Sequence, residues 1–198
     1  MYSTEAIVLG SVESGEADEM VSFYTKDFGK LSIKVKGSKK STTKQGNFLH
    51  KPSVVAFNFV SARAGYILSG IKSIRDYSAI SENIYALAYT SSFLGLASGI
   101  FYEGQKDEQT WNLLVSVLEE SSDLAEKNAE REQFWKKEKE WLIYLLHILG
   151  LKPEKLELGN INDASGIDKY IHDLLTNKLE RPIEFFGLRS SFKNHASK

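Results

Sequence analysis

The spacing of apolar residues changes once along this chain, and the change divides it into two regions of different structure. Up to about residue 77 the apolar residues form short runs or alternate with polar ones, as in β-strands. From Ser81 onward they recur every three or four residues, as in α-helices. We predict strands at 6–9, 20–25, 30–36, 53–60 and 66–71, and helices at 81–102, around 111–118, at 131–150 and at 167–179.

Five short strands within about 75 residues favour a small closed barrel, because closure removes the edges that an open sheet would expose. The pattern fits an SH3-like barrel nearly as well as an oligonucleotide-binding (OB) barrel, and we favour the second. Ser81 is the expected N-cap of a helix that is apolar on almost all sides, which predicts a central, buried helix. The predicted fold class is α+β multidomain, with a five-stranded OB-fold barrel at 1–78 and an all-helical domain at 79–198.

The segment Lys30–Lys51 contains seven lysines and no acidic residue, although the whole chain has 25 basic and 26 acidic residues. Within it, "KLSIKVK" alternates strictly, so Leu31, Ile33 and Val35 share one strand face and the lysines share the other. An exposed strand face is polar in any protein, and lysine also discourages edge-to-edge pairing. The missing acids favour a polyanion-binding surface, because a merely solvated face normally mixes charges of both signs.

A protein that binds single strands also needs aromatic side chains on which bases stack. Most aromatic residues of the first region are expected in the barrel core. Tyr24 shares a strand face with Met20 and Ser22, so it is a candidate for an outward-facing platform.

The sequence carries no signature of catalysis. It has no cysteine, no P-loop, no G-x-S-x-G or G-x-G-x-x-G motif, and its four histidines are not spaced as metal ligands. We therefore expect a protein that is not an enzyme and that uses no metal or other cofactor. No apolar run is long enough to span a membrane, and the N-terminus lacks a basic leader, so a cytoplasmic location is expected.

Four short blocks in the first 40 residues carry a resemblance to a known family. They are "IVL" at Ile7–Leu9, "GEAD" at Gly15–Asp18, "TKDFGK" at Thr25–Lys30 and "KGSKK" at Lys36–Lys40. In this order and spacing they resemble the opening of the bacterial RecO family of DNA repair and recombination mediators. "LLHILGLKPE", at Leu145–Glu154, resembles the family's helix before its C-terminal insert.

The resemblance implies an OB barrel, a helical domain, binding of single- and double-stranded DNA, and annealing of complementary strands. It also implies two partners, RecR and the C-terminal tail of single-strand-binding protein, through which the recombinase RecA replaces that protein on gapped DNA. The expected location is then the bacterial cytoplasm, in association with the nucleoid. A general single-stranded DNA- or RNA-binding OB-fold protein with no mediator role explains the basic stretch equally well.

The matched motif assigns the DNA-contact role to its own basic residues, Lys34, Lys36, Lys39 and Lys40, and charge and position add Lys44 and Arg63. An acidic tail that ends in an apolar residue needs an apolar pocket with a basic rim. For this partner-binding surface we nominate one helix face, with Arg131, Lys136, Lys137 and Lys139. Many relatives carry a four-cysteine zinc module after the helix ending near Gly150, and because this chain lacks cysteine we expect no zinc.

Overall fold

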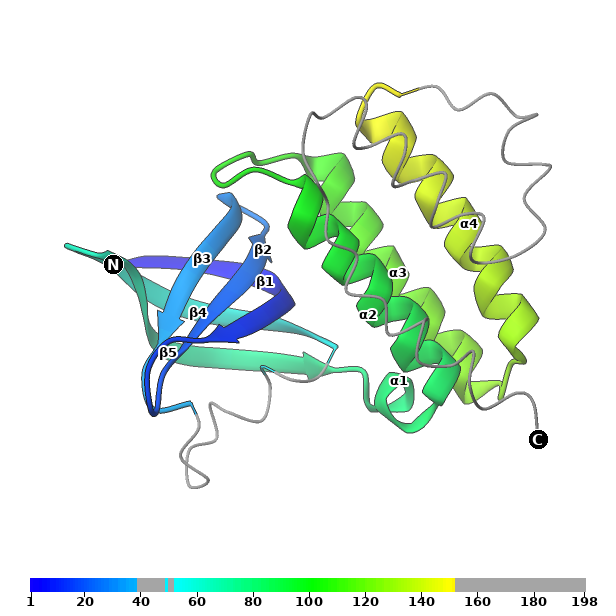
Figure 1. The fold of residues 1–198 in the computed structure, drawn as a ribbon, viewed down its shortest axis with the longest axis horizontal. Helices are drawn as coiled ribbons and strands as arrows, with labels where there is room; N and C mark the ends of the chain where they lie inside the picture. The colour runs from blue at the N-terminus through cyan, green and yellow to red at the C-terminus, as the bar shows by residue number, and fades with distance from the viewer. Residues whose placement is uncertain (39–48, 50–51, 152–198) are drawn as a thin grey trace.

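A computed structural model describes residues 1–38, 49 and 52–151. Within these residues, five strands come first and four helices follow (Figure 1). The strands are β1 (Tyr2–Glu13), β2 (Glu19–Thr25), β3 (Gly29–Val35), β4 (Ser53–Ala62) and β5 (Gly65–Asp76). The helices are α1 (Ser78–Glu82), α2 (Ile84–Ile100), α3 (Glu108–Glu126) and α4 (Arg131–Ile148). The helix predicted at 167–179 lies outside the described residues.

The five strands close into a barrel in the order β1-β2-β3-β5-β4, so the predicted barrel followed by helices is confirmed. Every neighbouring pair is antiparallel except β3 and β5, which run parallel where Ile33 pairs with Tyr66 and Lys34 with Ile67. The alternation predicted for β3 is also confirmed, because Leu31, Ile33 and Val35 are buried in the barrel interior.

The helices pack beside the barrel rather than around it (Figure 1). Helix α2 is buried on most of its surface, as its sequence predicts, and both α3 and α4 contact it. The prediction that Ser81 caps this helix is wrong, because Ser81 lies inside the short helix α1. Asn83 caps α2 instead: its side-chain oxygen accepts hydrogen bonds from the backbone N–H groups of Tyr85 and Ala86, both at 3.0 Å. No described helix is both long and apolar enough to cross a membrane.

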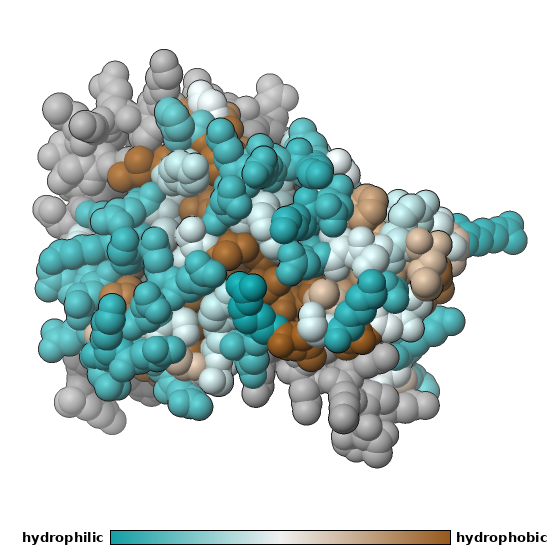
Figure 2. Space-filling model, turned by 180° about the vertical axis from the view of Figure 1, so that it is seen from behind, coloured by the Kyte–Doolittle hydropathy of each residue, from teal (hydrophilic) through white to brown (hydrophobic). Residues whose placement is uncertain are grey.

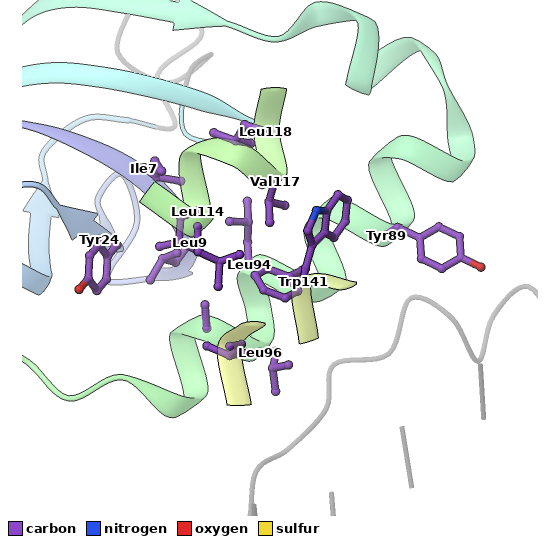
Figure 3. Packing of buried hydrophobic residues seen from close by; sticks show 14 of the residues in the cluster. Ile7, Leu9, Tyr24, Tyr89, Leu94, Leu96, Leu114, Val117, Leu118 and Trp141 are labelled. Carbon is purple, nitrogen blue, oxygen red and sulfur yellow. The ribbon is translucent and has the colours of Figure 1, made fainter. Parts of the chain in front are cut away.

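One apolar cluster crosses the boundary between the barrel and the helices. Ile7 and Leu9 of β1 and Tyr24 of β2 belong to the same buried cluster as Leu94 of α2 and Leu114 of α3 (Figure 3). Seen from behind, apolar surface also gathers over this boundary (Figure 2). The strand region ends at Asp76 and α1 begins at Ser78, close to the boundary read from the sequence, while the division into two domains at 78/79 stays a prediction.

The connection between α2 and α3 reaches back over the β2–β3 turn (Figure 1). Gly29, the first residue of β3 after that turn, has a positive φ of 69°, and a Cβ at this position would overlap the backbone carbonyl of Gln105. Gly65, the first residue of β5 after the β4–β5 turn, has a positive φ of 113° but open space around it. Comparing substitutions at these two glycines therefore distinguishes the cost of a strained backbone from the cost of a steric overlap.

We expect Gly29→Ala to lower the free energy of unfolding by about 1–2 kcal/mol through the left-handed backbone, and by about 1–3 kcal/mol more through overlap with Gln105. Gly65→Ala meets only the first cost. Urea denaturation of both variants measures the difference. Equal losses in the two variants would show that the α2–α3 connection is not held against the barrel turn.

Candidate nucleic-acid interface

The outward face of β3 is covered by protein along part of its length. The Lys30 ammonium donates a hydrogen bond to the backbone carbonyl of Ser98, in the last turn of α2. The Ser32 hydroxyl bonds to the carboxylate of Glu103, and the N–H of Gly104 donates to the Lys30 carbonyl at 2.9 Å. Lys30 therefore acts at this position as a partner for the carbonyl end of a helix.

Tyr24 faces outward from β2, as predicted, but it is only 1% exposed because the helical region covers it. Its ring packs edge-on against Phe101 at 5.5 Å, and its hydroxyl accepts a hydrogen bond from the N–H of Asp107 at 3.2 Å. Burial raises the pKa of its hydroxyl. The suggestion that Tyr24 is a stacking platform for bases is therefore wrong; it joins the barrel to the helices.

Asp18 organises the opposite end of β3. Its carboxylate accepts a hydrogen bond from the N–H of Gly37 at 3.0 Å and forms an ion pair with Lys34, also at 3.0 Å. The hydrogen bond from Gly37, together with Lys34, lowers the pKa of the Asp18 carboxyl group. Asp18 ends the "GEAD" block and Gly37 belongs to "KGSKK", so two of the four sequence blocks meet through one side chain.

A third block, "TKDFGK", forms the β2–β3 turn. The hydroxyl of Thr25 donates to the carbonyl of Gly29 at 2.7 Å and accepts from the N–H of Phe28 at 3.0 Å. The same Gly29 provides the close approach to Gln105. The residues that the motif specifies are therefore those that fix the two ends of β3.

The predicted DNA-contact residues do not form one cluster among the described residues. Lys34 is half-buried beside Asp18, and Lys36 is exposed just beyond β3. Arg63 lies in the β4–β5 turn, three residues before Tyr66. Tyr66 pairs with Ile33, and because β3 and β5 run parallel, Lys36 lies three residues beyond that pair in the opposite direction from Arg63. Lys39, Lys40 and Lys44 lie outside the described residues.

The nominated partner-binding residues lie along α4, where acidic groups already contact several of them. Lys136 pairs with Glu132 at 2.8 Å, and Lys137 pairs with Glu140 at 2.7 Å and with Glu120 of α3 at 3.4 Å. These contacts lower the pKa of Glu132 and raise that of Lys137. The Lys139 ammonium lies 3.8 Å from the centre of the Trp135 ring.

Trp141, the second tryptophan of α4, is buried and donates its ring N–H to Glu120 at 2.8 Å. Arg131 is exposed at the start of the helix. In the described part of the chain, no three His, Cys, Asp or Glu side chains are grouped closely enough to hold a metal ion.

Comparison with known proteins identifies the barrel. Residues 1–78 match the family described as recombination protein O N terminal. The N-terminal barrel of this chain is similar to the N-terminal domain of the RecO family. The resemblance stated from the four blocks is thereby confirmed, and because the RecO N-terminal domain is an OB fold, the OB barrel rather than the SH3-like barrel is correct.

The chain is similar to curated relatives named DNA repair protein RecO, of which three are described. The protein from Rubrobacter xylanophilus is 29% identical over 119 residues, which are 60% of this chain and 48% of the relative. That from Exiguobacterium sibiricum is 30% identical over 118 residues, 58% of this chain and 46% of the relative. That from Listeria monocytogenes (strain CLIP80459) is 24% identical over 166 residues, 84% of this chain and 62% of the relative. The chain thus spans about half the length of most of these relatives.

The contacts of Asp18 predict a specific dependence of stability on pH. Since its pKa is lower in the folded chain than the value of about 3.9 for an unfolded aspartate, its contribution is fully present above that value and is lost as the pH falls through the folded pKa. The stability difference between the wild type and Asp18→Asn should therefore be constant near neutral pH and shrink below about pH 4. Urea denaturation at several pH values measures it, with Glu16→Gln as the control for charge; a difference that persists at the lowest pH would contradict the assignment.

Proposed function

We propose that this chain is a DNA-binding recombination mediator that anneals complementary single strands. With RecR, it would help load RecA onto DNA coated with single-strand-binding protein. The observation that carries the proposal is the RecO match over 1–78. Within this barrel, Asp18 holds Lys34 and Gly37, which both belong to the lysine-rich segment Lys30–Lys51. The chain would act as two units, the barrel at 1–78 and the helical region at 79–198.

The proposed activity requires no bond chemistry. Two complementary strands repel each other through their phosphates, and a cationic surface that neutralises them leaves the bases free to pair. Phosphate contacts of this kind carry no sequence information, which suits a protein that acts on any gap. The proposal therefore assigns no catalytic residue.

The end of the barrel that carries Lys34 and Lys36 is the proposed main DNA-contact surface. Asp18 orients the backbone of Gly37, immediately after Lys36, through the 3.0 Å hydrogen bond. Lys39, Lys40 and Lys44 follow within a few residues in the sequence and complete the proposed surface. Arg63 contributes at a second place, in the β4–β5 turn.

Six phosphate contacts on a single strand would give a slope of about −4 for log K against log salt concentration. Lys36→Glu, and the double variant Lys39→Glu/Lys40→Glu, should weaken DNA binding, slow annealing and make this slope shallower, because each lost lysine removes one contact. Fluorescence anisotropy at several salt concentrations measures the slope, and a strand-annealing assay measures the activity.

Two further variants serve as controls for that experiment. Lys127→Glu makes the same charge change at the end of α3, on the helical region, and should leave the slope unchanged. Asp18→Asn removes the acid beside Lys34 while keeping an acceptor for Gly37, and should strengthen DNA binding. If Lys36→Glu, the double variant and Lys127→Glu all behave as the wild type, this end of the barrel is not the DNA site. Failure to capture RecR, with DNA binding intact, would favour the general single-strand-binding alternative.

The α4 face is the proposed docking surface for the acidic tail of single-strand-binding protein. Trp135 is half-buried between basic residues of this helix, and an acidic tail would replace the intramolecular acids that now pair with Lys136 and Lys137. Because those acids compete with it, binding should be weak and sensitive to salt.

Lys136→Glu and Arg131→Glu should each weaken binding of a tail peptide several-fold, because each replaces an attractive charge by a repulsive one. Titration calorimetry of the peptide against these variants measures the change, with Lys127→Glu as the control on α3. Affinity equal to the wild type in both variants would remove α4 as the docking surface.

A further inference from the structure

An aromatic cavity opens at the end of the barrel away from Lys36. Its volume is about 380 Å³, within the range of about 300–1,000 Å³ that is usual for small-molecule sites. Tyr2, Phe28, Phe59 and Tyr66 line it, and the exposed side chains of Asp27 and Lys106 also face it. The cavity, here called the barrel-mouth pocket, lies where β1 begins, β2 turns into β3 and β4 turns into β5.

Phe59 is the centre of this aromatic group and is itself buried. Phe28 and Tyr66 meet it edge-to-face, with ring centres at 5.5 and 5.3 Å. Tyr2 stacks on it at 5.2 Å with an angle of 25° between the rings. Tyr2 nevertheless remains 46% exposed, so a further planar ring has access to extend the stack that Phe59 and Tyr2 begin.

The polar groups around the pocket have the signs that a nucleotide requires. Asp27 is held in place by the Thr4 hydroxyl, which donates to its carboxylate at 2.8 Å, and a carboxylate accepts N–H groups from the edge of a base. Lys106 lines the pocket, and Arg63 precedes Tyr66 by three residues in the exposed β4–β5 turn. Both cations suit the phosphates on either side of that base.

We infer that the barrel-mouth pocket binds one unpaired nucleobase of a single-stranded nucleic acid, stacked on Tyr2. The inference rests on the proposed DNA-binding function and adds a base-contacting site to it. It also gives Arg63 a role: the turn that carries Arg63 is separated from Lys36 because it serves this second place of contact. The helical region covers Tyr24 on the outward face of β2, and the base is held at the mouth of the barrel instead.

The test uses the full chain and two strands of about 16 nucleotides, one normal and one in which every base is removed, so that only the sugar–phosphate chain remains. Tyr2→Leu should weaken binding of the normal strand by about 5- to 100-fold and leave binding of the baseless strand unchanged. The salt slope should not change, because no phosphate contact is lost. A 2-aminopurine base in the normal strand should lose part of its fluorescence on binding the wild type and regain it with Tyr2→Leu.

Tyr2→Phe, which keeps the ring, should bind as the wild type does, so a role in folding is separated from a role in stacking. Tyr144→Leu on α4 is the matched control, since Tyr144 is also 46% exposed, and it should bind both strands normally. If Tyr2→Leu changes binding of the two strands by the same factor, or of neither, the base site is disproved. That result is distinct from failure of the proposed function, in which the wild type would bind neither strand in a salt-dependent way.

Discussion

The packing of the helical region against one outer face of the barrel is the constraint on which the other features depend. Tyr24 is buried under the α2–α3 connection, and Lys30 is bound to the last turn of α2. Burying a large side chain such as that of Tyr24 contributes about 1.5–3 kcal/mol to stability. The contacts of Tyr24 and Lys30 also hold the barrel against the helices. Glycine at position 29 is required because this connection passes so close to the turn.

This packing determines where a nucleic acid has access. OB folds commonly bind oligonucleotides across strands 2 and 3, and here the helical region occupies part of that surface. Two places on the described barrel stay accessible beside that surface: the end with Lys34 and Lys36, and the barrel-mouth pocket at the other end. A β-strand of the length of β3 spans about 20–25 Å. The two ends of the barrel are therefore separated by several nucleotides of an extended single-stranded nucleic acid. In the proposed function, the cationic end would bind any phosphate chain, and the aromatic end would distinguish a single-stranded nucleic acid from a duplex, because only an unpaired base is free to stack.

The sequence was sufficient for the strands and for the described longer helices because each depends on a local pattern. The sequence did not predict the burial of Tyr24, because the residues that cover this outer face, Gln105 and Asp107, lie 81 and 83 positions away. A signal for this was present in adjacent apolar residues. Ile7 beside Val8, and Tyr24 beside Phe23, place one side chain in the barrel interior and the other in the shared cluster. A strand with one solvated face has no need of such pairs. The barrel-mouth pocket was missed because Tyr2 lies before the apolar run from which the first strand was predicted.

The lysines of the segment Lys30–Lys51 look equivalent in the sequence, but the fold gives them different partners. Lys30 is committed to a helix end, and Lys34 shares its charge with Asp18, an acid from outside the stretch. A phosphate that approaches Lys34 must therefore compete with Asp18, so a contact with Lys34 would contribute less to DNA affinity than a contact with an unpaired lysine. The same carboxylate holds Gly37 in place, just after Lys36. Asp18 thus offsets positive charge at the end of β3 through Lys34 and also holds the backbone at Gly37, the last glycine before the described part of this segment ends at Ser38.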